Sequence, residues 1–209
     1  MKPVSRRQFL ISAACLPVAA LLPITAKAAS STIHELEGDV YINSRPLNAA
    51  SKIKSGDEIV VSHDGKLVFS IGEDAYLLRG GSVLQVNLHN NNVLVSSLRL
   101  VTGAVLGVFG KRSSTTHIHT ATATIGIRGT AVYVDASPHQ CYTCTCYGRT
   151  DLVVGQQREE VIAAHHNAHM VSAAPAGNRQ MQVFESKGHS DDELRMLEAL
   201  VGRKPLFDV

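Results

Sequence analysis

Short apolar runs separated by turn residues make up most of the chain from residue 33 onward. These runs are β-branched or alternate apolar with polar side chains, and they cover residues 40–42, 66–71, 75–79, 82–88 and 93–108. Strands at such close spacing, with almost no helical periodicity, predict an all-β domain. Periodicity alone leaves the architecture open between a coiled β-solenoid and a β-roll or sandwich.

Turn residues separate the predicted strands. Asp64 and Gly65 both tolerate a positive φ, so they predict a type I′ hairpin turn before the strand at residues 66–71. Residues 44–46 (Ser-Arg-Pro) predict a turn after the first short strand, and residues 89–92 (His-Asn-Asn-Asn) a polar loop. The chain should therefore reverse direction every few residues.

The stretch at residues 120–134 predicts a strand, a bend and a second strand. Threonine, isoleucine, valine and tyrosine suit a half-buried pleated surface. Gly126 and Gly129 interrupt it where a side chain cannot fit or where φ is positive.

One amphipathic helix is predicted at the C-terminus. Ser190 and Glu193 have the spacing of a capping box, and acidic residues follow the cap at the positive end of the helix dipole. Leu194, Leu197, Leu200 and Val201 form one apolar stripe, and Gly202 is placed to end the helix. We expect this stripe to close one end of the β-stack.

Residues 97–110 and 120–134 together resemble the FecR domain, named for the iron-dicitrate regulator of bacterial cell envelopes. A leucine-rich strand ends in a glycine turn, and a threonine-rich strand then closes on a Gly-Thr step, which Arg128, Gly129 and Thr130 supply here. The similarity covers roughly residues 36–155 and implies strands wound as a solenoid or roll. It also implies a non-catalytic binding or sensing module with an envelope protein partner.

FecR sensors couple an outer-membrane receptor to an anti-sigma domain across the inner membrane. This sequence shows neither the cytosolic helical domain nor the spanning helix of that plan. We therefore do not expect it to signal across the membrane alone.

The first 28 residues resemble a twin-arginine export signal. Residues 5–10 (Ser-Arg-Arg-Gln-Phe-Leu) precede an apolar run at residues 11–24, and residues 26–28 (Ala-Lys-Ala) offer a cleavage step. The run is interrupted by Pro17 and Pro23 and is too short to span a bilayer, so we expect a periplasmic mature chain without a membrane span.

Charge argues against nucleic acid as a partner. Of 20 basic and 18 acidic side chains, four bases and no acid lie in the predicted signal, which leaves a net charge of −2. No dense basic face remains to contact a phosphate backbone. We accordingly predict three segments: the signal at residues 1–28, a FecR-like β-domain at 29–155, and a β-hairpin plus helix at 156–209 packed on that domain.

Three cysteines lie within six positions of the mature chain: Cys141, Cys144 and Cys146. In a turn, Cys141 and Cys144 could both bind one tetrahedral zinc or iron, whereas in a strand they point to opposite faces. In a strand, Cys144 and Cys146 share one face, at a separation near the limit for an unstrained disulfide. An odd number of cysteines in an oxidising compartment leaves a thiol free, bridged to another chain, or bound to metal.

Histidines at residues 165, 166 and 169 could supply further ligands. In a helix, His165 and His169 would lie on one face. We favour a hairpin turning at His166 and Asn167, which would gather the three histidines at its tip. We predict a transition-metal site, for zinc, iron or copper, formed by Cys144, Cys146, His165 and His166, with Cys141 and His169 less favoured. The alternative is solvated histidines beside small buried thiols.

The sequence contains no catalytic motif such as G-x-S-x-G, a P-loop or H-E-x-x-H, so we expect no enzyme activity. Two functions remain. The first is an exported FecR-like binding or sensing module, and the second is a periplasmic metal-binding or thiol-redox protein that uses the cysteine and histidine cluster.

Overall fold

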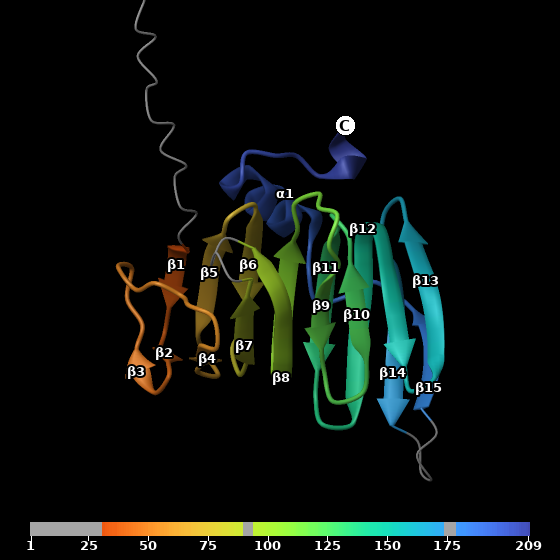
Figure 1. Cartoon of the computed structure of the whole chain (residues 1–209), viewed down its shortest axis with the longest axis horizontal. Helices are drawn as coiled ribbons and strands as arrows, with labels where there is room; N and C mark the ends of the chain where they lie inside the picture. The colour runs from red at the N-terminus through yellow and green to blue at the C-terminus, as the bar shows by residue number, and fades with distance from the viewer. Residues whose placement is uncertain (1–30, 90–93, 174–178) are drawn as a thin grey trace, which may run out of the picture.

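The protein is described by a computed structural model that covers residues 31–89, 94–173 and 179–209. The predicted export signal and most of the polar loop after His89 lie outside these residues. The fold is all-β with one C-terminal helix, which confirms the predicted class (Figure 1). Within the described residues, no helix is long and apolar enough to cross a membrane.

The elements follow in chain order: β1 (Thr32–Glu37), β2 (Val40–Ile42), β3 (Arg45–Pro46), β4 (Glu58–Val61), β5 (Lys66–Ile71), β6 (Asp74–Leu78), β7 (Val83–Leu88), β8 (Val95–Val108), β9 (Thr116–His119), β10 (Thr124–Ile127), β11 (Ala131–Ala136), β12 (Gln140–Val154), β13 (Gln157–Ala163), β14 (Asn167–Ala173), β15 (Arg179–Phe184), α1 (Asp191–Leu200) and the 3₁₀ turn η2 (Leu206–Asp208).

Two sheets pack face to face, so the architecture is a sandwich rather than a solenoid. Sheet A has the antiparallel order β1-β5-β6-β8-β11-β12-β14-β15. Sheet B has the order β3-β2-β4-β7-β8-β9-β10-β12-β13, in which only β8 and β9 are parallel. The apolar side chains that the two sheets turn toward each other form the interior.

Strands β8 and β12 belong to both sheets, because each crosses from one to the other at a glycine. The first part of β8 pairs with β7 in sheet B, and the part after Gly103 pairs with β6 and β11 in sheet A. β12 crosses in the reverse direction at Gly148. Gly103 and Gly148 have φ of +82° and +85°, a conformation that bends the strand and that L side chains rarely adopt.

The central part of sheet A is buried on both faces. Alternate residues of β6, β8 and β11 point into the interior, while those between them, such as Leu77, Leu106 and Val108, form a second apolar cluster on the outer face. This arrangement accounts for runs such as Asp74–Leu78, in which every residue is buried.

Helix α1 covers the outer face of sheet A, near the upper end of the strands in Figure 1. The predicted capping box between Ser190 and Glu193 is formed, and Gly202 follows the helix with φ of +73°. Leu194 and Leu197 are fully buried against β6 and β8. The helix therefore covers a sheet face instead of closing the end of the stack, because the apolar side chains that need cover lie on that face.

Two turn predictions are wrong for the same reason. Asp64 and Gly65 do not form a hairpin turn, since β4 lies in sheet B and β5 in sheet A, and neither residue has a positive φ. The hairpin predicted at His166 and Asn167 is also absent, because β13 and β14 each pair with a different half of β12. In both places the chain moves between sheets rather than returning along a neighbouring strand.

A buried ion pair joins Arg112, in the connection after β8, to Asp74 at the start of β6. Asp74 is fully buried and accepts hydrogen bonds from the Arg112 guanidinium, the Tyr76 hydroxyl and the Gly110 amide. Arg112 also donates to the Val95 carbonyl at 3.2 Å. Both carboxylate oxygens of Asp74 thus accept hydrogen bonds, and the Arg112 guanidinium balances the negative charge.

We predict that Arg112→Met costs about 3–5 kcal/mol of unfolding free energy, because it leaves the Asp74 carboxylate buried without a counter-charge. Asp151→Asn, which breaks an exposed ion pair with Arg158, should cost less than about 1 kcal/mol. Urea denaturation measures both, and equal costs would show that burial does not govern these pairs.

We also predict that Gly103→Ala is far more damaging than Gly56→Ala. Both glycines have a positive φ, but an added Cβ at Gly103 would lie 2.5 Å from the Ser82 Cα, whereas nothing lies within 4 Å of one at Gly56. Backbone strain alone should cost about 1–2 kcal/mol at Gly56, and the added clash about 3–5 kcal/mol at Gly103. Equal melting temperatures would mean that the strand crossing tolerates a side chain.

Candidate metal centre

Strand β12 places two thiols on the outer face of sheet A. Cys144 and Cys146 are two residues apart in an extended strand, so both join the outer apolar cluster, whereas Cys141 points into the interior between the sheets. All three are buried free thiols. This is the division of the cysteines expected for an extended strand.

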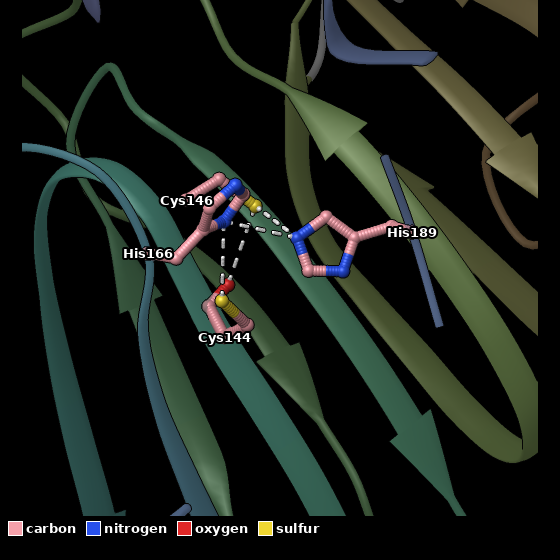
Figure 2. A group of neighbouring side chains, drawn as sticks. All are labelled: Cys144, Cys146, His166 and His189. Atoms are coloured by element: carbon pink, nitrogen blue, oxygen red, sulfur yellow. Dashed lines mark hydrogen bonds between the residues drawn. The ribbon is translucent and has the colours of Figure 1, made fainter. Parts of the chain in front are cut away.

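Two histidines meet these thiols from other parts of the chain (Figure 2). His166 lies in the connection between β13 and β14, with φ of +50°. Because β14 pairs with β12 in the register Thr145 with Asn167, this connection ends beside the two cysteines. His189 comes from the segment just before α1, and its ring stacks on Tyr133 of β11 at 4.8 Å between centroids.

The four candidate ligand atoms lie at the corners of a compact group, all within 4.8 Å of one another. Nδ1 of His166 is 3.2 Å from Nε2 of His189, which is 3.2 Å from Sγ of Cys146. Sγ of Cys144 is 3.7 Å from Nδ1 of His166. A tetrahedral zinc centre with ordinary bond lengths has edges of roughly 3.3 Å between nitrogens and roughly 3.6 Å between nitrogen and sulfur. The observed separations are close to these edges.

Hydrogen bonds outside the group fix which ring nitrogens are free. Nε2 of His166 lies 2.9 Å from Oδ1 of Asp191, and Nδ1 of His189 lies 3.0 Å from the Lys187 carbonyl. Both oxygens only accept, so each of these nitrogens carries a proton. In the neutral rings the facing nitrogens, Nδ1 of His166 and Nε2 of His189, then present lone pairs. With both rings neutral, four electron-pair donors face one another with at most two thiol protons between them.

The two thiols differ in acidity. A hydrogen bond from Cys146, with smaller contributions from His189 and His166, lowers the pKa of Cys144 to about 4 against the opposing effect of burial. Burial raises the pKa of Cys146 well above its ordinary value, and the Cys144 thiolate adds to the rise. Two thiolates and a divalent cation would form a neutral group, which is the charge state that a buried site favours.

Asp191 is the outer partner of this centre. Burial raises the pKa of Asp191, but hydrogen bonds from His166 and His165 outweigh it and hold the pKa below its usual value. A carboxylate that accepts from a ligating histidine fixes the ring orientation and increases the basicity of the opposite nitrogen. Asp191 is also the first residue of α1, so the start of the helix and the centre share one side chain.

The structure brings together three of the four predicted ligands: Cys144, Cys146 and His166. His165 lies outside the group, because its Nε2 is directed at Asp191, 3.0 Å from Oδ1. Cys141 is on the other face of β12, and His169 is buried with its Nε2 3.6 Å from the Glu159 carboxylate. Neither of the less favoured residues reaches the centre.

His189 is the candidate ligand that sequence reasoning missed. It is 43 residues from Cys146, and the local pattern marks it only as the residue before a helix cap. A histidine immediately before a capping box could have been noted as a candidate ligand, since the cap fixes the backbone that follows it. The sequence does not reveal which strand the helix covers, and therefore not which residues such a histidine would meet.

The three residues of the FecR-like resemblance, Arg128, Gly129 and Thr130, lie at the corner where the chain passes between the sheets. Gly129 has φ of +70°, as predicted, and an added Cβ would lie 2.9 Å from the Lys111 Cα. The Thr130 carbonyl accepts from the Phe109 amide at 3.0 Å, and Arg128 donates to the Thr115 hydroxyl at 3.0 Å. The motif thus turns the chain from β10 in sheet B to β11 in sheet A.

The sequence matches no protein-family model and no curated protein. Two crystal structures of a candidate anti-sigma factor from Parabacteroides distasonis, at 1.65 and 2.50 Å resolution, have a similar fold, with TM-scores of 0.51 and 0.52. They are 12% and 11% identical in sequence, and each likeness covers 61% of this chain and 60% of the other. The likeness is therefore one of fold, and it agrees at that level with the FecR resemblance.

We predict that Asp191→Ala weakens zinc binding by about 10–100-fold, because the His166 ring loses the carboxylate that orients it. Asp192→Ala is the matched control, since Asp192 is the next residue of the same helix turn and its side chain is 92% exposed. Competition against a chromophoric chelator measures both affinities. Equal losses would assign the effect to helix charge instead of ring orientation.

Proposed function

We propose that this chain is an exported, non-catalytic binding module of the cell envelope that holds one divalent transition metal ion, zinc by preference. The observation that carries the proposal is the set of four facing electron-pair donors, Cys144, Cys146, His166 and His189, at separations near those of a tetrahedral centre. Asp191 and the Lys187 carbonyl hold the two rings in the tautomers that a metal needs.

The donor set supports a binding role rather than a catalytic one. Catalytic zinc keeps one position open for water or substrate, whereas a site with four protein ligands is closed. Soft thiolates with imidazole favour zinc, iron or copper over magnesium and calcium. A monovalent copper ion would leave a buried net charge of −1 on two thiolates, so a divalent ion suits this site better.

The predicted twin-arginine signal and the FecR-like scaffold support the envelope part of the proposal. The twin-arginine route carries folded proteins, so a centre filled in the cytoplasm would reach the periplasm with its thiolates protected from oxidation. The similar fold of a candidate anti-sigma factor supports a sensing role with a protein partner in the envelope. Metal occupancy would then be the quantity that the module reports.

Metal content tests the proposal. Protein purified without a histidine tag should contain about one zinc per chain, and cobalt should give the visible absorption of a tetrahedral thiolate site. Cys144→Ser, Cys146→Ser, His166→Ala and His189→Ala should each abolish stoichiometric binding. Cys141→Ala and His117→Ala are the controls, because Cys141 faces the interior and His117 lies in β9 of sheet B.

Absence of metal from the purified protein, together with no uptake of zinc or cobalt by the reduced protein, would overturn the proposal. Equal metal retention in the control variants and the ligand variants would place the ion elsewhere. Either result would leave the FecR-like module without a metal site at these four residues.

A further inference from the structure

The residues before and within the first turn of α1 serve two purposes at once. His189 supplies a donor atom to the metal centre, Ser190 caps the helix, and Asp191 orients His166. Glu193 completes the capping box and forms an ion pair at 2.7 Å with Arg79, the residue that follows β6. Residues 189–193 thus form the helix start and also contribute to the metal centre.

Tertiary contacts, and not intrinsic helix stability, hold the C-terminal segment, which we define as residues 185–209. Helix α1 has 10 residues, fewer than the roughly 12–15 that an isolated helix needs to be even marginally stable in water. Its position depends on Leu194 and Leu197, which are buried on the outer face of sheet A, and on Arg79, which also donates to the Gly188 carbonyl at 3.0 Å.

We propose that metal binding and docking of the C-terminal segment on sheet A are one linked equilibrium, in which the bound ion stabilises the docked state. The inference rests on the metal-binding function proposed above. Cys144, Cys146 and His166 remain on the β-scaffold when the segment leaves, but His189 and Asp191 leave with it. An ion bound to the undocked protein therefore has one ligand fewer and a ring without its orienting carboxylate, so it binds the docked state more tightly.

Release of the segment would change the surface of the protein. The outer face of sheet A carries apolar side chains, among them Leu77, Leu106 and Tyr133, which are buried in the docked structure. The leucine stripe of α1 would be uncovered at the same time. Loss of the ion therefore converts two mutually buried apolar surfaces into exposed ones, which is a metal-dependent output suited to a sensing module.

Linkage requires that changes in the helix alter metal affinity even where no ligand is touched. Leu197→Ala should lower zinc affinity by at least about tenfold, because it favours the undocked state and Leu197 offers no ligand atom. Leu84→Ala is the matched control: Leu84 is also 0% exposed, but it lies in the interior between the two sheets. Its zinc affinity should stay within about threefold of the wild type.

Two further measurements keep the test decisive if Leu197→Ala folds poorly. Arg79→Gln removes the contacts to Glu193 and Gly188 from a side chain that is 33% exposed, and it should also weaken zinc binding. In the wild-type chain, zinc should slow amide hydrogen exchange across residues 190–201 while exchange in β4 and β7 of sheet B is unchanged.

The outcomes separate the two proposals. Suppose that the wild type binds zinc through the four ligands, that Leu197→Ala and Arg79→Gln bind it equally well, and that zinc does not change amide hydrogen exchange in the segment. The linkage is then overturned, and metal binding stands. If the wild type binds no zinc or cobalt, both proposals are overturned. Equal weakening by Leu84→Ala would assign the effect to general destabilisation and would also overturn the linkage.

Discussion

The bends of β8 and β12 at Gly103 and Gly148 are the constraint on which the rest of the structure depends. Each strand is long enough to serve both sheets, but it can do so only where the backbone adopts a positive φ and the partner chain approaches closely. At Gly103 the approaching partner is the backbone of Ser82, and at Gly148 it is Thr130. These two crossings join the sheets along their length, so neither sheet folds as a separate unit.

The crossing of β12 also explains why a site lies where it does. Before Gly148, β12 is buried on both faces, because this part of sheet A lies between the interior and the C-terminal segment. Thiols at Cys144 and Cys146 suit such a face as small apolar side chains. They become candidate ligands only because His166 and His189 present free ring nitrogens at the same place. The candidate ligands thus lie in the buried interface between sheet A and the C-terminal segment.

Much of the fold follows from local sequence. β5 spans Lys66–Ile71, as the apolar run predicts, and the capping box at Ser190 and Glu193 forms in the predicted helix. Gly129 has the positive φ that its place between two β-rich runs indicates. Alternation along a strand also places Cys144 and Cys146 together and Cys141 apart. These features are decided by interactions between residues close in the chain, where side-chain type and spacing carry the information.

Only the tertiary structure decided which strands pair and which residues complete the site. Asp64 and Gly65 suit a hairpin turn, yet β4 and β5 belong to different sheets, because burying both apolar faces of sheet A outweighs a local turn preference. His189 joins Cys146 across 43 residues because α1 docks on the outer face of sheet A. His165 is adjacent to His166, yet its Nε2 lies against Asp191 and outside the group of four candidate ligand atoms. Such placements depend on packing between distant segments, which local periodicity does not encode.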